Sequence, residues 1–205
     1  MAATLASRKP VPLNLPPDTV LLTIDVQKGF DQFPQRNNPR LEGNVAALHV
    51  AWRDAGRPLI HVRHDSREPE SVFRPGQPGN DFKPEAAPAN GEAVVRKSVH
   101  SAFIGTDLEG RLRAAGANTL VILGIQTNFC VASTARMAGN LGYKTFVVGD
   151  ACATFGQKLL DGKTVAAQMV HDLALAELHG EFATVVSTQD VLASLIGAPL
   201  KQGTH

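Results

Sequence analysis

The sequence has 205 residues, of which 43% are hydrophobic and 19% charged, the proportions of a globular chain that buries a full core without disulfides or metals. Its 20 basic and 19 acidic side chains leave a formal net charge of +1. No Lys/Arg cluster indicates a phosphate-binding surface, so nucleic acid is disfavoured as a partner. The apolar runs have strand length, below the roughly 18 residues that span a bilayer, so we expect no membrane partner.

In chain order, short aliphatic runs alternate with segments of helical period. The expected strands are residues 19–26, 57–64, 92–97, 118–125, 143–150 and 182–187. The expected helices are residues 40–56, 107–116, a segment after Cys130, 164–180 and 188–196. The strands are almost continuously apolar, as they are when helices cover both faces of a sheet. This alternation predicts an α/β fold with a mainly parallel sheet of about six strands.

We expect a single domain over residues 18–205, preceded by an extended, partly disordered arm over residues 1–17. The arm lacks a charged segment followed by an apolar one, so it is not a secretory signal. In a chain without a leader, Cys130 and Cys152 are expected to be reduced thiols in a cytoplasmic protein.

One connection, residues 65–91, is long and rich in Pro and Gly and has no clear period. Connections of this length in a compact domain are usually functional or disordered. Phe73 and Phe82 favour an ordered loop that packs on the body of the domain. We therefore interpret the segment as a lid or pocket wall, with a surface excursion without function as the alternative.

Reactive side chains stand where three of the expected strands end. Asp25 ends the first strand, Lys97 the third, and Cys130 follows the fourth. Ligands of open α/β sheets bind at the carboxyl ends of the strands, so we expect these side chains to lie at one edge. Each has a simpler interpretation alone, and a buried free cysteine is usually a small core residue. All three at one edge indicate a site.

The three residue types fit acyl transfer through a thioester. A thiolate is the nucleophile, and we expect the helix start and Lys97 to lower the pKa of Cys130. Asp25 can take the thiol proton and pass it to a leaving amine. Backbone N–H groups near Cys130 are candidates for stabilising an oxyanion.

These segments resemble the isochorismatase-like cysteine hydrolases, which include nicotinamidases and carbamoylsarcosine amidases, over about residues 20–195. "DVQKGF" is similar to the family's D-x-Q-x-x-F stretch with the catalytic aspartate, and "KSVHSAF" to its lysine segment. "GIQTNFCV" is similar to its G-x-x-T-x-x-C-V stretch with the nucleophile.

The resemblance implies a catalytic triad of Asp25, Lys97 and Cys130 on a three-layer αβα, Rossmann-like fold. It also implies a cis peptide bond between Ile125 and Gln126, with the backbone amides of Gln126 and Cys130 as the oxyanion hole. A small-molecule substrate, no cofactor and a homodimer or homotetramer are further implications. Cleavage of a C–N bond in an amide, imide, lactam or carbamoyl compound is the expected activity.

Several aromatic side chains flank the triad positions. Phe30, Phe103 and Phe129 are candidates for lining an apolar pocket for a planar substrate, with core filling as the alternative for each. His100, just past Lys97, is a candidate substrate-binding residue, with loop packing or solvent exposure as the alternative.

The histidines do not form the metal-binding pattern of the metal-dependent nicotinamidases, an Asp-x-His followed by a further His. In "HVRHDS", His61 lies inside the strand, and the adjacent His64 and Asp65 are expected to point to opposite faces. We therefore expect no metal. The remaining candidates have structural interpretations: packing or surface exposure for His171 and His179, a position just past a strand for Cys152, and a loop-bracing hydrogen bond for Asp150.

Three other functions are alternatives, and the sequence lacks the motif that the second or the third would need. An isochorismatase-type hydrolase would cleave a vinyl ether with Asp25 as the acid. A dinucleotide-binding module would need G-x-G-x-x-G after the first strand, where "DVQKGF" stands. A non-catalytic or thiol-redox protein on the same fold would predict a C-x-x-C pair, which the sequence lacks.

Overall fold

The central element of the fold is a parallel sheet. The computed structural model describes Val11 and residues 13–196. Within this range six strands form one sheet in the order β3-β2-β1-β4-β5-β8, and every neighbouring pair is parallel. The strands are β1 (Val20–Ile24), β2 (Leu59–His64), β3 (Ala93–Lys97), β4 (Thr119–Ile125), β5 (Lys144–Ala153) and β8 (Thr184–Val186). The predicted parallel sheet of about six strands is confirmed.

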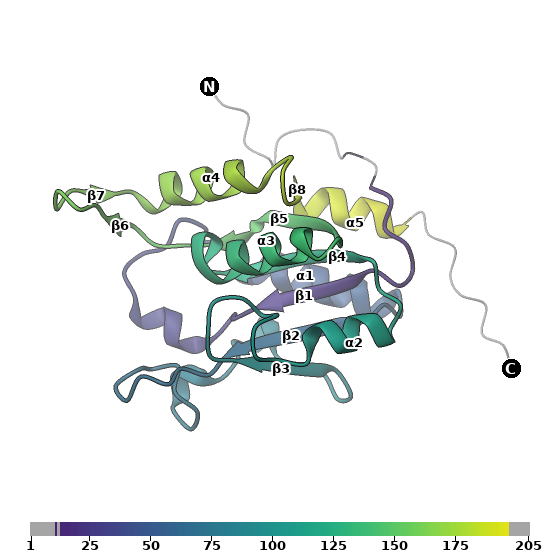
Figure 1. The fold of residues 1–205 in the computed structure, drawn as a ribbon, viewed down its shortest axis with the longest axis horizontal. Helices are drawn as coiled ribbons and strands as arrows, with labels where there is room; N and C mark the ends of the chain where they lie inside the picture. The colour runs from purple at the N-terminus through teal and green to yellow at the C-terminus, as the bar shows by residue number, and fades with distance from the viewer. Residues whose placement is uncertain (1–10, 12, 197–205) are drawn as a thin grey trace, which may run out of the picture.

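Helices cover both faces of this sheet. They are α1 (Leu41–Asp54), α2 (Leu108–Ala114), α3 (Ala132–Asn140), α4 (Ala167–Leu178) and α5 (Thr188–Ile196). Helix α1 contacts α5, and α3 contacts α4. In Figure 1, α2 and α3 lie in front of the sheet and α1 lies behind it. The expected three-layer α/β architecture is therefore present.

The core follows from the apolar pattern of the strands and of α1. Every residue of β1 and β4 is buried, as expected for strands with helices on both faces. On α1, Leu41, Val45, Leu48 and Trp52 are buried at a helical spacing that forms one stripe. The helix is followed by Gly56, whose φ of 60° is the left-handed conformation that glycine accepts without strain.

Two element boundaries lie three residues from the sequence-based expectation. Strand β5 continues to Ala153, so Cys152 lies inside the strand and not just past it. Helix α4 begins at Ala167, and not at 164. Thr164–Val165 (β7) instead pairs antiparallel with Gln157–Lys158 (β6). These two β-branched residues therefore lie in a hairpin and not in the predicted helix.

The N-terminal arm forms no helix or strand over its described part, and there it packs on the domain. Leu15 is buried. The guanidinium of Arg57 donates hydrogen bonds to the carbonyl oxygens of Leu15 at 3.0 Å and Pro16 at 2.8 Å. The backbone N–H of Leu13 donates to Ser194 Oγ at 3.1 Å, which attaches the arm to α5. Residues 1–10 of the expected arm, and residue 12, lie outside the described residues.

The long connection, residues 65–91, is ordered and attached to the chain after β1. The N–H of Lys83 donates to the carbonyl of Val26, and the N–H of Lys28 donates to the carbonyl of Asp81, both at 2.9 Å. Between them, Gln27 and Phe82 form an isolated antiparallel bridge. The segment therefore covers the end of β1.

Among the helices described, none is long and apolar enough to span a bilayer.

Candidate active site

The three side chains from the strand ends meet at the carboxyl edge of the sheet. Asp25 follows β1, Lys97 ends β3, and Cys130 lies in a π-helical turn, Thr127–Val131, between β4 and α3. Lys97 Nζ is 2.5 Å from Asp25 Oδ2 and 3.3 Å from Cys130 Sγ. The exposed fractions are 0% for Asp25, 2% for Lys97 and 8% for Cys130. The three groups are therefore coupled and largely shielded from water.

The backbone next to Asp25 is unusually tight. Asp25 itself has a φ of 51°, a left-handed conformation that is costly for a residue with a side chain. On the neighbouring strand, Gly124 has a φ of 133°, and a Cβ there would lie 2.0 Å from the carbonyl oxygen of Ile24. Only glycine allows this close approach of β1 and β4, which sets the distance between Asp25 and the turn that carries Cys130.

The ammonium of Lys97 is surrounded by acceptors. Besides Asp25 and Cys130, it lies 3.3 Å from His64 Nδ1 and donates to the carbonyl of Val99 at 3.1 Å. Burial acts to lower the pKa of Lys97, but the charges of Asp25 and Cys130 outweigh burial, and the pKa is raised. Lys97 is therefore a fixed positive charge at neutral pH.

Among the described residues, one group of side chains has the geometry for holding a metal ion: Asp25, His64 and Cys130. One potential ligand atom from each lies within 4.8 Å of the others. The Lys97 ammonium contacts all three, so a cation already stands where a metal would bind. Asp65 points away, as strand alternation predicts, and pairs with Arg63 at 3.2 Å and Arg96 at 2.5 Å.

The pKa of Cys130 is shifted in the direction opposite to the one expected from its position at a helix start. Burial first, and then the negative charge of Asp25, raise the pKa of this thiol to about 12, although Lys97 acts to lower it. The expectation of a lowered pKa is therefore wrong for the site without substrate. At neutral pH Cys130 is a thiol, and a base has to remove its proton when it reacts.

The turn around Cys130 has a defined backbone. A cis peptide bond joins Ile125 and Gln126, as the family resemblance implied. The carbonyl of Gln126 accepts the N–H of Val131 at 3.1 Å. At the start of the turn, Thr127 Oγ1 shares a buried 2.8 Å hydrogen bond with Nδ1 of His171 from α4. His171, expected in a packing or surface role, thus supports the turn that carries Cys130.

The remaining predicted residues lie at different distances from the thiol. His100 Nδ1 is 3.5 Å from Cys130 Sγ, and the His100 ring stacks on Phe129 with a centroid distance of 5.4 Å. Both side chains are exposed, so a molecule in the solvent can reach them beside the thiol. Phe103 instead stacks on Tyr143 at 5.9 Å, which places its ring against the start of β5.

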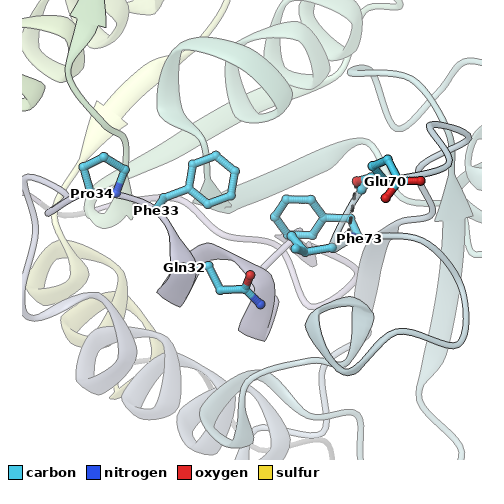
Figure 2. A pocket seen from close by; sticks show the side chains of 7 residues that line it. Gln32, Phe33, Pro34, Glu70 and Phe73 are labelled. Carbon is cyan, nitrogen blue, oxygen red and sulfur yellow. Dashed lines mark hydrogen bonds between the residues drawn. The ribbon is translucent and has the colours of Figure 1, made fainter.

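Phe30 belongs to an aromatic cluster with Phe33, Phe73 and Phe155. Its ring centroid lies 4.6 Å from Phe73, 5.6 Å from Phe33 and 5.9 Å from Phe155. Two hollows border this cluster, with volumes of about 360 and 300 Å³. Figure 2 shows the larger one, where the rings of Phe33 and Phe73 lie on its sides with Gln32 and Glu70. None of the triad side chains lines either hollow.

Comparison with known sequences identifies the family. A sequence profile of the isochorismatase domain matches residues 19–190. The chain belongs to the isochorismatase family. It is 38% identical over 178 residues to the isochorismatase family protein YrdC of Bacillus subtilis, with 86% of this chain and 95% of YrdC covered. The solved structure of an isochorismatase-family protein from Chromobacterium violaceum is 46% identical, with a TM-score of 0.88 over 93% of this chain and 100% of that chain.

Isochorismatase-family relatives with named activities are hydrolases. A solved cysteine hydrolase from Pseudomonas syringae is 25% identical, with a TM-score of 0.83 over 94% of this chain and 100% of that chain. Nicotinamidase 3 of Arabidopsis thaliana is 27% identical over 190 residues, which cover 86% of this chain and 88% of that protein.

Two polar residues of this isochorismatase-family chain have structural roles, as expected. Cys152 is completely buried in β5, and burial raises the pKa of its thiol to about 12. Asp150 Oδ1 accepts hydrogen bonds from the N–H of Thr188 at 2.7 Å and from its hydroxyl at 2.8 Å. Asp150 therefore connects β5 to the start of α5.

Sequence reasoning missed three residues around the isochorismatase-family site. The side chain of Gln27 accepts the N–H of His64 at 2.9 Å and donates to the carbonyls of His64 at 3.1 Å and Asn80 at 2.8 Å. The side chain of Asn80 donates to the carbonyls of His64 at 2.9 Å and Phe73 at 2.7 Å. These amides join β1, β2 and the 65–91 segment. His64 stands opposite Lys97 in the register of β2 and β3, a pairing that the sequence analysis did not predict.

Proposed function

We propose that this chain is a cysteine hydrolase that cleaves the C–N bond of a small-molecule amide, imide, lactam or carbamoyl compound through a thioester. The contact of Lys97 Nζ with both Asp25 Oδ2 and Cys130 Sγ carries this proposal. It unites a base, a fixed cation and a potential nucleophile in one buried cluster. The named cysteine hydrolase and nicotinamidase among the relatives support the same chemistry.

In the first half of the reaction, Cys130 Sγ attacks the substrate carbonyl carbon while its proton passes to Asp25. The carbonyl becomes a tetrahedral oxyanion, which the backbone N–H groups of Gln126 and Cys130 stabilise. The C–N bond then breaks, the nitrogen takes the proton from Asp25, and the amine or amide leaves. The acyl group remains on Cys130 as a thioester.

In the second half, Asp25 accepts a proton from a water molecule that attacks the thioester carbonyl. The second tetrahedral oxyanion collapses, the C–S bond breaks, and Sγ recovers the proton from Asp25. The products are the acid and the thiol enzyme. Lys97 stays protonated throughout and lowers the energy of each state in which Sγ or the substrate oxygen carries negative charge.

The test replaces the nucleophile. Cys130→Ala and Cys130→Ser should abolish turnover in a screen of primary amides, imides, lactams and carbamoyl compounds while the thermal unfolding temperature changes little. Cys152→Ala is the matched control, because Cys152 is completely buried away from the cluster, and it should retain turnover. Chelation should leave the wild-type rate unchanged, since Lys97 supplies the positive charge.

Iodoacetamide labelling gives an independent measurement. Mass spectrometry of the native protein should find Cys130 modified before Cys152. Modification of Cys152 first, with turnover retained, would contradict the assignment of the nucleophile.

An isochorismatase-type vinyl-ether hydrolase is the second candidate. Asp25 pairs with Lys97 through Oδ2, and its Oδ1 has no hydrogen-bond partner among the described residues, so Oδ1 is the oxygen that would carry the proton to the vinyl ether. That reaction does not need the thiol. Vinyl-ether cleavage that persists in Cys130→Ala and is lost in Asp25→Asn would favour it.

A further inference from the structure

Among the described residues, His64 is the one titratable side chain that contacts the Lys97 ammonium and has no task in the proposed mechanism. Its Nδ1 lies 3.3 Å from Lys97 Nζ. Its backbone is held on both sides, because Gln27 Oε1 accepts its N–H and the side-chain amides of Gln27 and Asn80 donate to its carbonyl. The backbone of His64 is therefore fixed, and the contact of Nδ1 with Lys97 orients the ring.

The contact with Lys97 determines the tautomer of His64. An ammonium has no acceptor atom, so Nδ1 has to be the acceptor of this hydrogen bond. A neutral ring that accepts at Nδ1 carries its proton on Nε2. Burial first, and then the positive charge of Lys97, lower the pKa of His64, so the ring stays neutral at neutral pH.

The Nε2–H group is therefore a donor on the side of the ring away from Lys97. Over the described part of the chain, no residue accepts a hydrogen bond from it. The ring is only partly buried, and it lies edge-on to Phe73, at a centroid distance of 6.4 Å. Phe73 in turn lines the hollow of about 360 Å³ in Figure 2. An oriented donor thus stands between the thiol cluster and an aromatic hollow.

We propose that His64 is a specificity-determining residue that donates a hydrogen bond from Nε2 to a second acceptor of the substrate. The inference rests on the proposed function and narrows its substrate class. The preferred compounds are planar and carry another carbonyl oxygen or ring nitrogen near the scissile C–N bond, as cyclic imides do. Their flat part packs against Phe73.

A positioning role is the alternative, in which His64 only holds the ammonium of Lys97. The two roles predict different readouts. Loss of substrate recognition weakens the binding of compounds with the second acceptor and leaves the others unchanged. Loss of Lys97 orientation shifts the pH profile of Cys130 alkylation and affects all compounds equally.

The experiment measures binding without turnover, in the Cys130→Ala protein. The probes are two pairs that differ by one carbonyl: succinimide against 2-pyrrolidinone, and phthalimide against isoindolin-1-one. Calorimetric titration should show that the imide of each pair binds up to about tenfold more tightly, the range of one neutral hydrogen bond. In Cys130→Ala/His64→Leu this preference should fall to about one, and His64→Gln, which retains a donor, should restore part of it.

An unchanged imide preference in the His64→Leu variant, or no binding of any of the four probes, overturns the inference. A changed alkylation profile in His64→Leu with an unchanged binding preference also overturns it, in favour of the positioning role. Failure of the proposed function is seen separately, as turnover that survives Cys130→Ala, because the binding measurement does not depend on turnover.

Discussion

At the scale of single residues, the pKa of Cys130 is set by burial and by its charged neighbours, and not by its place at the start of a helix. Burial and Asp25 raise the pKa of its thiol to about 12, and Lys97 opposes them. The resting site therefore holds a protonated thiol between a carboxylate and an ammonium. In the proposed mechanism, the thiolate forms only when this proton passes to Asp25, so activation of Cys130 is coupled to its attack on the substrate.

This arrangement predicts that turnover and thiol reactivity respond in opposite directions to Asp25→Asn. Removal of the carboxylate charge lowers the pKa of Cys130, so iodoacetamide should alkylate the thiol faster at neutral pH, by about tenfold for each unit that the pKa falls. Turnover should fall by about 10²–10⁴-fold, because both proton transfers lose their base. Lys97→Gln should raise the pKa of Cys130 and slow both processes.

The measurement is the alkylation rate against pH for the wild type and both variants, beside their turnover rates. Lys144→Gln is a control for the loss of a positive charge, since Lys144 is exposed at the start of β5. Identical alkylation profiles in all four proteins would mean that Cys130 is not coupled to Asp25 or Lys97.

At the scale of elements, the buried amide of Asn80 is one of the groups that hold the 65–91 segment against the sheet. Asn80 is 3% exposed, and its side chain donates to the carbonyls of His64 and Phe73 and to Asp65 Oδ1, the last at 3.0 Å. The backbone carbonyl of Asn80 accepts a hydrogen bond from the side-chain amide of Gln27. The amide thus connects the segment to the ends of β1 and β2, beside His64.

Asn80→Ala should release this connection. The buried carbonyls lose their donor, at a cost of about 1–3 kcal/mol in the free energy of unfolding. Limited proteolysis followed by mass spectrometry should find the first cleavage within 65–91, and thermal unfolding should occur at a lower temperature. Asn118→Ala is the control, because Asn118 is exposed and makes only a local bond to Gly116, and it should leave both readouts unchanged. Cleavage elsewhere first would contradict the anchoring role.

At the scale of the whole molecule, the β6–β7 hairpin and the helix that follows it, α4, both carry exposed apolar side chains. The hairpin of β6 and β7 projects beyond the start of α4 in Figure 1. Leu159 and Leu160 lie between its strands, and Leu160 is fully exposed. Met169 and Leu173, one turn apart on α4, are 61% and 59% exposed. A two-stranded hairpin has little stability alone, so such a surface is suited to contact with another chain.

We expect a homodimer or homotetramer that buries this surface. Leu160→Glu combined with Met169→Glu should lower the molar mass measured by light scattering at micromolar concentration, because a buried unpaired carboxylate opposes association. Val50→Glu is the control, since Val50 is 56% exposed on α1, across the sheet from α3. A wild-type protein that is monomeric under these conditions would refute the expectation.

The sequence by itself determined the class of the fold and the composition of the candidate triad. Strand and helix periods depend on near neighbours, so the alternation of elements was visible in the chain. Parallel strands bring their carboxyl ends to one edge of the sheet, so the sequence predicted that Asp25, Lys97 and Cys130 meet at that edge, as they do. The family resemblance added the cis peptide bond between Ile125 and Gln126.

Only the tertiary structure decided what surrounds those residues. The sign of the pKa shift of Cys130 depends on how completely the fold removes water, which no local pattern records. The contact of His64 with Lys97 requires β2 to lie beside β3, and the role of Asn80 requires the 65–91 segment to fold back on β1. Strand order, burial and loop packing arise from contacts between residues far apart in the chain, so they follow from the assembled core.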